Sequence, residues 1–507
     1  MDSSHILLSL GLALTFWIVA RGLHRTHRLP GPAETGRAAA AADISAAACG
    51  FLAALFLLKT LPLLGSPIGL LRRDFLFPLR ALWRDGNGVH WLLPITILAV
   101  MLITIILRSG QRILPQVLTT GVLMGLAASL WICLSLTNGG WPEGLLEPLV
   151  RSADYYIDVE RFPSLAALWR DYVVQQPYLS VYGRTHPPGA LTVLWVLDRA
   201  WGMYVPGVAF TIVLLASLGV LPVVLWARRF LGDRQTPATV ALWILTPSVA
   251  LYGATSMDMI FAVPLLAAGA LFALAVAGDP ESSQGGPGHM VKAAAAGLFL
   301  AIGFLFTFSA AVLAVAFVLT SALVPRSLRR HALVMVAVSG VTSMIVVGVV
   351  ALATGFDPVA CLQTAMALDA IDAPATLSLR YYLLTRLMGI LDHLVMSGVI
   401  IAPIWLGVVL LGWRRQPDGE STDDRVLLAL SRAAALSVAL FLALGAYKIG
   451  ETGRIFVFLM PFLLIPAVRR LSIQYARPQT LSWALAVVAA WHLGQTVLME
   501  WFLDTRW

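Results

Sequence analysis

Apolar segments long enough to cross a lipid bilayer recur from one end of the chain to the other. Of its residues, 59% are hydrophobic and 12% are charged, and the mean hydropathy is +0.83. Runs of about 18 or more apolar residues are typical of transmembrane helices, and lipid leaves only helices or closed barrels to satisfy the backbone. The sequence therefore predicts an all-α, polytopic transmembrane helical bundle of about 13 or 14 helices. The apolar segments lie near residues 4–22, 42–65, 91–107, 113–136, 206–228, 237–255, 258–278, 292–325, 331–354, 390–411, 426–446, 451–468 and 480–500.

Two of these segments need separate interpretation. The first, near residues 4–19, is followed by Arg21, Arg25 and Arg28 without a small-residue cleavage site between them. We therefore expect a retained anchor rather than a removed signal peptide. The segment 292–325 is longer than one span. At a rise of about 1.5 Å per residue it could form two short helices or one long tilted helix.

Arginine-rich loops between the apolar segments predict the orientation of the bundle. Short loops rich in Lys and Arg face the cytoplasm, and alternating the spans from them places residues 137–188, 355–389 and 447–454 on the opposite, outer side. This topology explains the net charge of +8. We expect no nucleic-acid binding, since the chain has no basic soluble module. The arginine-rich loops contain Arg228-Arg229, Arg326, Arg329-Arg330, Arg414-Arg415 and Arg469-Arg470.

Three outer segments predict helices at the membrane surface. Residues 189–204 are apolar but short, and they include two charged side chains, so we expect a re-entrant or interfacial helix. Apolar residues at helical spacing also predict two amphipathic helices in the interface plane. Their stripes consist of Leu165, Leu168, Trp169, Tyr172 and Val173, and of Leu377, Tyr381, Leu384 and Met388.

Three carboxylates gather at the start of the first long outer loop. Asp154, Asp158 and Glu160 are interleaved with Tyr155 and Tyr156. A partly desolvated carboxylate at a membrane surface is a candidate general base for a hydroxyl acceptor, and Asp154 and Asp158 would share one face of an α-helix. The pair could instead bind a divalent cation through its oxygens. A third interpretation is a solvated loop whose acids pair with neighbouring arginines.

A double proline marks the end of the same loop. Pro187 and Pro188 directly follow Arg184 and His186 in the sequence Arg-Thr-His-Pro-Pro-Gly. Prolines end a preceding helix and are tolerated in the first turn of the next one, so both basic side chains would be held at a fixed place. Arginine is a natural partner of phosphate, which favours a phosphate site. The alternative is an ordinary boundary between a loop and a helix.

A late outer turn carries Lys448, Glu451 and Arg454. Basic residues are ordinarily concentrated on the cytoplasmic side, so cations here suggest an anionic ligand such as a lipid phosphate. The alternative is that they extend toward lipid headgroups. Asp258 lies on the same side between two apolar segments, and an ionisable group in that position usually faces a cavity.

No motif in the chain identifies a cofactor. Cys49, Cys133 and Cys361 lack the paired spacing of a metal or redox site, which favours buried, inert thiols. Whether a divalent cation takes part stays open, because the carboxylates of the outer loop could bind one.

Together these motifs resemble the GT-C superfamily of integral membrane glycosyltransferases, above all the protein O-mannosyltransferases and the aminoarabinose transferase type. In that superfamily an acidic motif with tyrosines opens the first outer loop, and a His-Pro-Pro or Lys-Pro-Pro motif follows it. The Asp154–Tyr156 stretch and His186 with its two prolines occupy those places. The turn from Lys448 to Arg454 is similar to the superfamily's basic motif at the outer edge.

The resemblance implies transfer of a sugar, with inversion, from a polyprenyl-phosphate donor to an acceptor at the outer face of the inner or plasma membrane. The acceptor stays open. Residues 113–470 would form the catalytic module, between N-terminal helices in 1–112 and a C-terminal helix in 471–507. Asp154 would correspond to the catalytic acid, and Asp158 could replace the missing second acid. The candidates for substrate binding are Tyr155, Tyr156, Glu160, Arg184, His186, Asp258, Lys448, Glu451 and Arg454.

Two other functions use similar features. A transporter or a flippase of lipid-linked glycans lines its substrate path with intramembrane charges, and such proteins often contain inverted repeats. The sequence has no internal repeat, and its charges gather at one side. An O-antigen ligase or polymerase would use the same lipid-linked substrates, but a large late outer loop would favour it. Here the largest polar loop is early.

Overall fold

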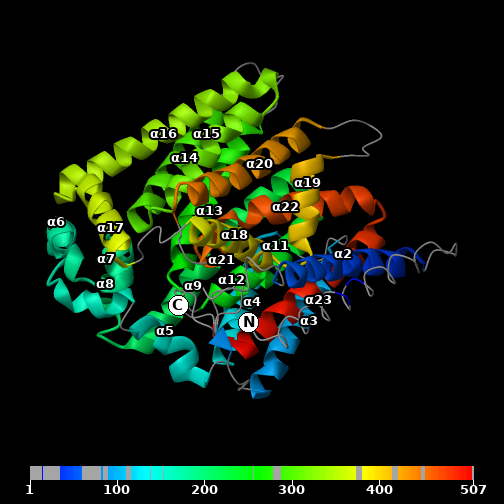
Figure 1. Ribbon diagram of the computed structural model, residues 1–507, viewed down its shortest axis with the longest axis horizontal. Helices are drawn as coiled ribbons and strands as arrows, with labels where there is room; N and C mark the ends of the chain where they lie inside the picture. Colours follow the sequence, from blue (N-terminus) through cyan, green and yellow to red (C-terminus); the bar gives the residue numbers. More distant parts are fainter. Residues whose placement is uncertain are drawn as a thin grey trace.

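The protein is a bundle of α-helices, seen in a computed structural model (Figure 1). Two very short strands, β1 (Leu82–Trp83) and β2 (Leu503–Asp504), pair antiparallel and connect the N-terminal region to the C-terminal end. Most of the first expected span, near residues 4–19, lies outside the described residues. The structure describes residues 35–59, 82–83, 89–109, 116–137, 139–151, 154–254, 256–277, 287–372, 379–413, 421–446 and 451–504, with Leu14 and Trp17.

Within these ranges, nine helices are long and apolar enough to cross a membrane, or ten with one bent pair. The prediction of a polytopic helical bundle is confirmed, and the chain is a multi-pass membrane protein. Three shorter apolar helices, α3 (Leu92–Leu107), α11 (Thr236–Leu245) and α15 (Ala310–Leu323), add to the bundle. The spans contain α2 (Thr35–Lys59), α4 (Gln116–Leu136), α9 (Val205–Ser217) with α10 (Val220–Leu231), α13 (Asp258–Val276), α14 (Pro287–Phe306), α16 (Arg326–Thr354), α20 (Thr422–Ala443), η5 (Val457–Leu459) with α22 (Met460–Gln474), and α23 (Pro478–Phe502).

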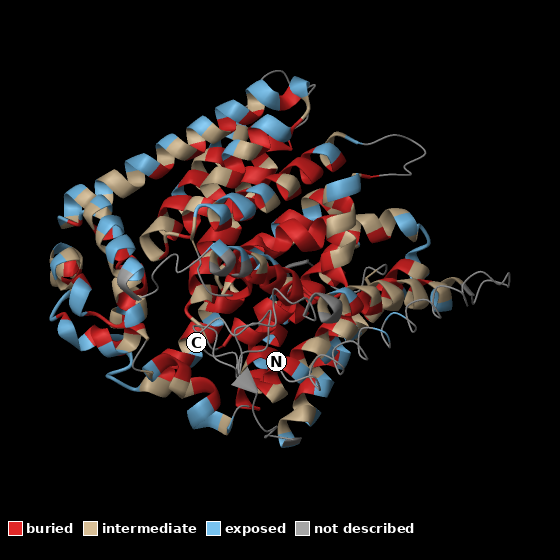
Figure 2. Cartoon of the chain, in the orientation of Figure 1, coloured by how far each residue is buried: buried red, intermediate tan, exposed pale blue. Residues whose placement is uncertain are grey.

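The helices differ in how they are surrounded. α13 is buried along nearly its whole length, whereas α16 runs along the edge of the molecule and exposes Met344 and Leu352 (Figure 2). A helix that is apolar on all sides belongs in the interior of a bundle. Apolar residues on the outside of a membrane protein face lipid tails. The bundle is therefore organised around α13.

The long apolar segment 292–325 forms two helices. α14 ends at Phe306 and α15 begins at Ala310, and in the break the Ser309 amide donates a hydrogen bond to Thr307 Oγ1 at 3.2 Å. Of the two arrangements that the length allowed, the structure has the pair of short helices. Pro325 then precedes α16 as its N-cap.

At one end of the bundle, ion pairs of arginine and polar contacts of histidine join neighbouring helices. Arg229 Nη1 lies 2.5 Å from Asp423 Oδ2, and Arg469 Nε lies 2.7 Å from Asp424 Oδ1. Ring nitrogens of His289 and His331 both contact the carbonyl oxygen of Ala275 near the end of α13. Asp258 begins the same helix, so the loops expected in the cytoplasm lie at the opposite end of α13 from the candidate site. Arg414 and Arg415 lie outside the described residues.

The loop of residues 137–188, expected on the outer side and called the first outer loop, folds into short helices that cover the other end of the bundle (Figure 1). The first predicted amphipathic helix is α6, whose N-cap Ser164 accepts a hydrogen bond from the Ala167 amide at 3.1 Å. Its apolar stripe packs against protein, because Trp169 and Tyr172 both meet Phe356 edge-on. The elements of this region are η2 (Trp141–Leu146), α5 (Glu147–Val150), η3 (Tyr155–Arg161), α6 (Leu165–Gln175), η4 (Gln176–Tyr178), α7 (Val181–Thr185) and α8 (Gly189–Ala200).

Helix α8 fits the expected re-entrant or interfacial helix, since its 12 residues are too few to cross a bilayer. The second outer loop contains α17 (Pro358–Asp372) and the start of α18 (Leu379–Met396). Of the second predicted stripe, Leu377 lies outside the described residues. α18 continues into α19 (Ile401–Leu411) through a bend of 114°.

Close packing of α14 on α16 gives a test of the fold. A Cβ atom at Gly297 would lie 2.2 Å from the Ser339 carbonyl oxygen, whereas one at Gly340 would meet no described atom within 4 Å. Gly297→Ala should therefore lower the unfolding temperature in detergent, since overpacking costs about 1–3 kcal/mol. Gly340→Ala, the matched control, should leave it unchanged or raise it. Equal unfolding temperatures for both variants would contradict this packing.

Candidate functional site

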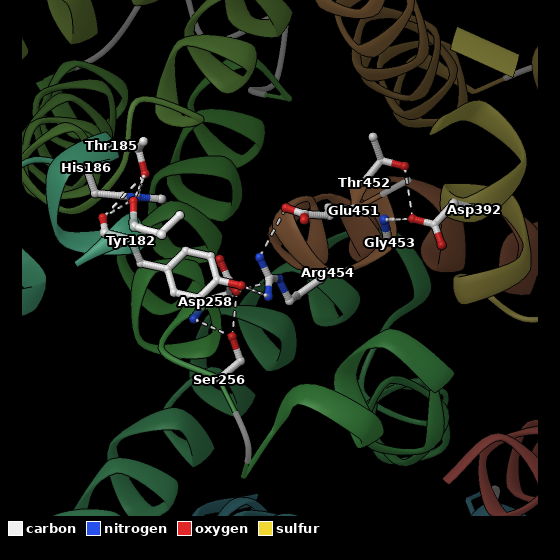
Figure 3. Close-up of polar contacts among 11 residues, drawn as sticks. Tyr182, Thr185, His186, Ser256, Asp258, Asp392, Glu451, Thr452, Gly453 and Arg454 are labelled. Carbon is white, nitrogen blue, oxygen red and sulfur yellow. Dashed lines mark hydrogen bonds and ion pairs between the residues drawn. The ribbon is translucent and has the colours of Figure 1, made fainter. Parts of the chain in front are cut away.

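The guanidinium of Arg454 is at the centre of the candidate site (Figure 3). It comes from the short helix α21 (Thr452–Ile455), and its side chain is only 10% exposed. Nε lies 3.1 Å from Asp258 Oδ2, and Nη2 lies 3.3 Å from Glu451 Oε2. Nη1 donates to the Tyr182 hydroxyl at 3.3 Å, and the guanidinium lies over the Tyr182 ring. One cation thus joins α21, α13 and the first outer loop.

The side chain of Asp258 is held in place by the start of α13. Its backbone amide donates to Ser256 Oγ at 3.0 Å, and the Ser256 hydroxyl donates back to Asp258 Oδ2. A carboxylate in the first turn of a helix is also stabilised by the helix dipole. Asp258 is therefore already oriented toward Arg454 by its own chain segment.

Aromatic rings connect the acidic motif to the proline motif. The Tyr155 ring stacks on Tyr182 with ring centres 5.9 Å apart, and it meets His186 edge-on at 5.6 Å. Phe261 of α13 closes the group at 6.0 Å from Tyr155. Burial raises the pKa of Tyr155, so its hydroxyl stays protonated. The two motifs, although separated in sequence, share one aromatic cluster beside Arg454.

His186 is a neutral member of this cluster. Burial lowers the pKa of its imidazole below the usual value, which keeps the ring uncharged at neutral pH. Its Nδ1 lies 3.0 Å from the Tyr182 carbonyl oxygen, which can only accept, so the proton belongs on Nδ1 in that contact. With its one proton on Nδ1, His186 can only accept a hydrogen bond from a ligand, through Nε2, and it does not supply the positive charge expected from the sequence.

Asp154 lies just before η3, next to Tyr155. Its amide donates to the Arg151 carbonyl oxygen at 2.9 Å. Burial raises the pKa of Asp154 to about 7, although the positive charges of Arg454 and Arg151 act in the opposite direction and Asp258 adds to the rise. A carboxyl group with that pKa is half ionised at neutral pH, which suits a group that exchanges protons.

A small cavity of about 20 Å³, partly open to the surroundings, lies beside Asp154 and Tyr155. Most of its wall is apolar and includes Leu149, Leu194 and Ile212. The polar edge of the cavity is therefore formed by Asp154 together with nearby backbone and hydroxyl groups. A substrate group reaching Asp154 through this cavity would pass mainly hydrocarbon.

Asp158 is turned away from Asp154 and is fully buried. It accepts hydrogen bonds from the Ser180 amide at 2.8 Å and from Arg161 Nε at 3.2 Å. The prediction that Asp154 and Asp158 share a helical face is wrong, because residues 155–161 form a 3₁₀ helix. In that helix residues three apart are aligned, not residues four apart. The contacts of Asp158 hold the start of α7 in place.

The remaining candidates lie around this centre. The Tyr156 hydroxyl donates to Asp198 Oδ1 at 2.5 Å, which fastens η3 to α8. Glu160 is exposed. Arg184 lies in the last turn of α7, and its carbonyl oxygen accepts a hydrogen bond from Gln176 at 2.9 Å. Lys448 lies outside the described residues. The structure thus brings Asp154, Tyr155, His186, Asp258, Glu451 and Arg454 together.

Three residues of this site are not among the candidates drawn from the sequence. Tyr182 and Ser256 contact Arg454 and Asp258 directly, and Asp392 accepts hydrogen bonds from the turn that carries Arg454. An acidic residue inside an apolar segment is a functional signal, and this signal could have identified Asp392. Among the described residues, no group of three or more His, Cys, Asp or Glu side chains is arranged to hold a metal ion.

Comparison with known proteins finds similarity among solved structures, whereas no family model and no curated protein matches the chain. AglB, the oligosaccharyltransferase of Archaeoglobus fulgidus in complex with an inhibitory peptide and a dolichol-phosphate, is 14% identical with a TM-score of 0.49, covering 75% of this chain and 56% of that chain. ArnT from Cupriavidus metallidurans in the apo state is 15% identical with a TM-score of 0.31, covering 81% and 76%. Both are GT-C glycosyltransferases.

A second structure of the Archaeoglobus oligosaccharyltransferase, in complex with Zn and sulfate, is 15% identical with a TM-score of 0.48. The chain spans little more than half the length of these oligosaccharyltransferases, at 53% and 56%.

The buried contacts of Asp158 predict a structural effect. Asp158→Ala leaves the Ser180 amide buried without its acceptor, which costs about 1–3 kcal/mol, so the unfolding temperature should fall. Asp171→Ala is the control, because Asp171 is an exposed acid of the same loop that pairs with its neighbour Arg170. A variant at Asp158 that unfolds like the wild type but has lost activity would instead favour a catalytic role.

Proposed function

We propose that this chain is a membrane glycosyltransferase that moves a sugar from a polyprenyl-phosphate donor to an acceptor hydroxyl at the outer face. The observation that carries the proposal is the joining of Asp154 to Arg454 through the stacked rings of Tyr155 and Tyr182. A group that can take up a proton and a cation that can bind phosphate are what such a transfer needs. Both lie at the end of the bundle away from Arg229 and Arg469.

Arg454 is the proposed partner of the donor phosphate. A leaving phosphate gains negative charge, and a positioned guanidinium stabilises that charge through two parallel hydrogen bonds. Glu451 is the more exposed of the two carboxylates on Arg454, at 21% against 15% for Asp258. We expect phosphate to displace Glu451 and to leave Asp258 in place. Arg184 and Lys448 are proposed as additional cations for the same phosphate.

Asp154 is the proposed base. The acceptor oxygen attacks the anomeric carbon while its proton passes to Asp154, and the bond from that carbon to the phosphate oxygen breaks with its electron pair on the phosphate. The product keeps the sugar, and polyprenyl phosphate leaves beside Arg454. Attack on the side opposite the leaving group inverts the anomeric carbon. The apolar cavity beside Asp154 is the proposed approach for one of the two substrates.

The surroundings of the site support surface chemistry over transport. Asp258 starts a membrane span and Arg454 precedes another, so both lie at helix ends and not at mid-depth. A transport path would place its charges within the spans. We further propose that residues 113–470 form the catalytic module, between N-terminal helices in 1–112 and the C-terminal helix in 471–507, in the inner or plasma membrane.

Asp154→Asn tests the proposed base. The amide cannot take up the acceptor proton, so transfer of label from a radiolabelled polyprenyl-phosphate sugar should fall by about 100-fold or more. The unfolding temperature should stay near that of the wild type. Asp171→Asn, an identical exchange at an exposed position of the same loop, should transfer normally. Retained transfer by the Asp154 variant would overturn the assignment.

The raised pKa of Asp154 predicts the pH dependence of transfer. The base acts in its ionised form, so the rate should rise about tenfold per pH unit below 7 and level off above it. Because the pKa is raised from 3.8 on folding, Asp154 also stabilises the fold at low pH, and this contribution is lost as the pH rises through about 7. Initial rates between pH 5.5 and 8.5 measure the profile. A flat profile would contradict the role of Asp154.

A further inference from the structure

We propose that Asp392 is a positioning residue for Arg454. Its carboxylate fixes the Thr452–Gly453 turn from which the Arg454 guanidinium reaches Tyr182, Asp258 and Glu451 (Figure 3). The inference rests on the proposed function for its effect on phosphate binding. The positioning itself depends only on the contacts of these residues.

The contacts of Asp392 are direct and buried. Oδ2 accepts a hydrogen bond from the Gly453 amide at 2.7 Å and another from Thr452 Oγ1 at 3.2 Å. The residue is 3% exposed. A buried polar group is costly unless it is hydrogen-bonded, and leaving its partners unsatisfied costs about 1–3 kcal/mol. The donors both belong to the two residues directly before Arg454.

The close approach of the turn to α18 requires a glycine at position 453. A Cβ atom at Gly453 would lie 2.3 Å from Met396 Cγ and 3.2 Å from Asp392 Oδ2. The Thr452 hydroxyl shares its single proton between Asp392 Oδ2 and the Gly389 carbonyl oxygen. Only a glycine therefore lets the turn approach α18 closely enough for its amide to reach Asp392. Three residues of α18 thus contact the two residues before Arg454.

The same helix also holds the chain on the other side of the outer turn. Arg386 donates to the carbonyl oxygens of Leu442 and Ala446 at 2.7 and 2.6 Å, at the end of α20. Residues 442–446 and 452–453 therefore both contact α18.

The position of the Thr452–Gly453 backbone determines which groups the Arg454 guanidinium reaches. Asp258 belongs to α13 and Tyr182 to α7, whereas Glu451 is the N-cap of the same turn as Arg454. A shift of the turn would therefore break the contacts to Asp258 and Tyr182 together. Misplacement of a binding group by about 1 Å can cost about 100-fold in function. Asp392 touches none of the proposed reacting groups, which makes it a positioning residue and not a catalytic one.

Hydrogen exchange and ligand binding together test the proposal in the full-length protein in nanodiscs. In Asp392→Leu, the amides of a peptide covering residues 451–456 should exchange at least tenfold faster, and the affinity for undecaprenyl phosphate should fall about 100-fold. Asp392→Asn keeps an acceptor oxygen for the Gly453 amide and should lie close to the wild type in both measurements. Unchanged exchange in Asp392→Leu would overturn the proposal.

Two comparisons separate positioning from general damage. Asp424→Leu removes another buried carboxylate at the far end of the bundle; it should lower the unfolding temperature but leave undecaprenyl phosphate binding unchanged. The double variant of Asp392→Leu and Arg454→Gln should bind no more weakly than Arg454→Gln alone, because Asp392 acts through Arg454. Additive losses would overturn the proposal.

A gentler variant covers the case in which Asp392→Leu does not fold. Gly453→Ala pushes the turn off α18 without removing any charge, and it should reproduce the faster exchange and the weaker binding. Gly407→Ala on α19 meets no described atom within 4 Å and serves as its control. If Arg454→Gln binds undecaprenyl phosphate normally while exchange in Gly453→Ala is faster, the proposed phosphate site fails and the positioning of Arg454 stands.

Discussion

The pairing of one buried guanidinium with two carboxylates and a tyrosine determines the arrangement of the whole site. A charge taken out of water is tolerated only when partners replace the lost hydration. Arg454 finds these partners in Asp258, Glu451 and Tyr182. Because they belong to α13, α21 and the first outer loop, these three parts of the chain must be in place together before the cation is satisfied. The outer loop is therefore part of the folded bundle and not an appendage.

The two ends of the bundle use charge differently. At the arginine-rich end, Arg229 and Arg469 each meet an aspartate near the start of α20, and these pairs fasten helices to one another. At the other end, charged groups surround a cavity and an aromatic cluster. In a structural ion pair both charged groups are satisfied by each other. A ligand site needs at least one partner that a ligand can replace, and the Glu451 side chain is exposed enough to be replaced.

Hydropathy and spacing predicted the bundle well, because a bilayer imposes length and composition on every span. The double proline and the late basic turn also predicted which regions meet. Local geometry was harder to predict: the 3₁₀ form of residues 155–161 separates Asp158 from Asp154, and no short sequence pattern distinguishes it from an α-helix. The role of Asp392 depends on a contact between segments 60 residues apart, which periodicity does not encode.

The near-neutral pKa of Asp154 has a consequence for ligand binding itself. Binding and protonation at adjacent groups are linked, so an anion placed beside Asp154 makes that carboxyl hold its proton more tightly. If phosphate binds at Arg454, its arrival should draw protons from solution at pH values above about 7, where Asp154 is largely ionised. His186, kept neutral by burial, would contribute little to this uptake. Donor binding would therefore be measurable as proton uptake from a weakly buffered solution, before any sugar is transferred.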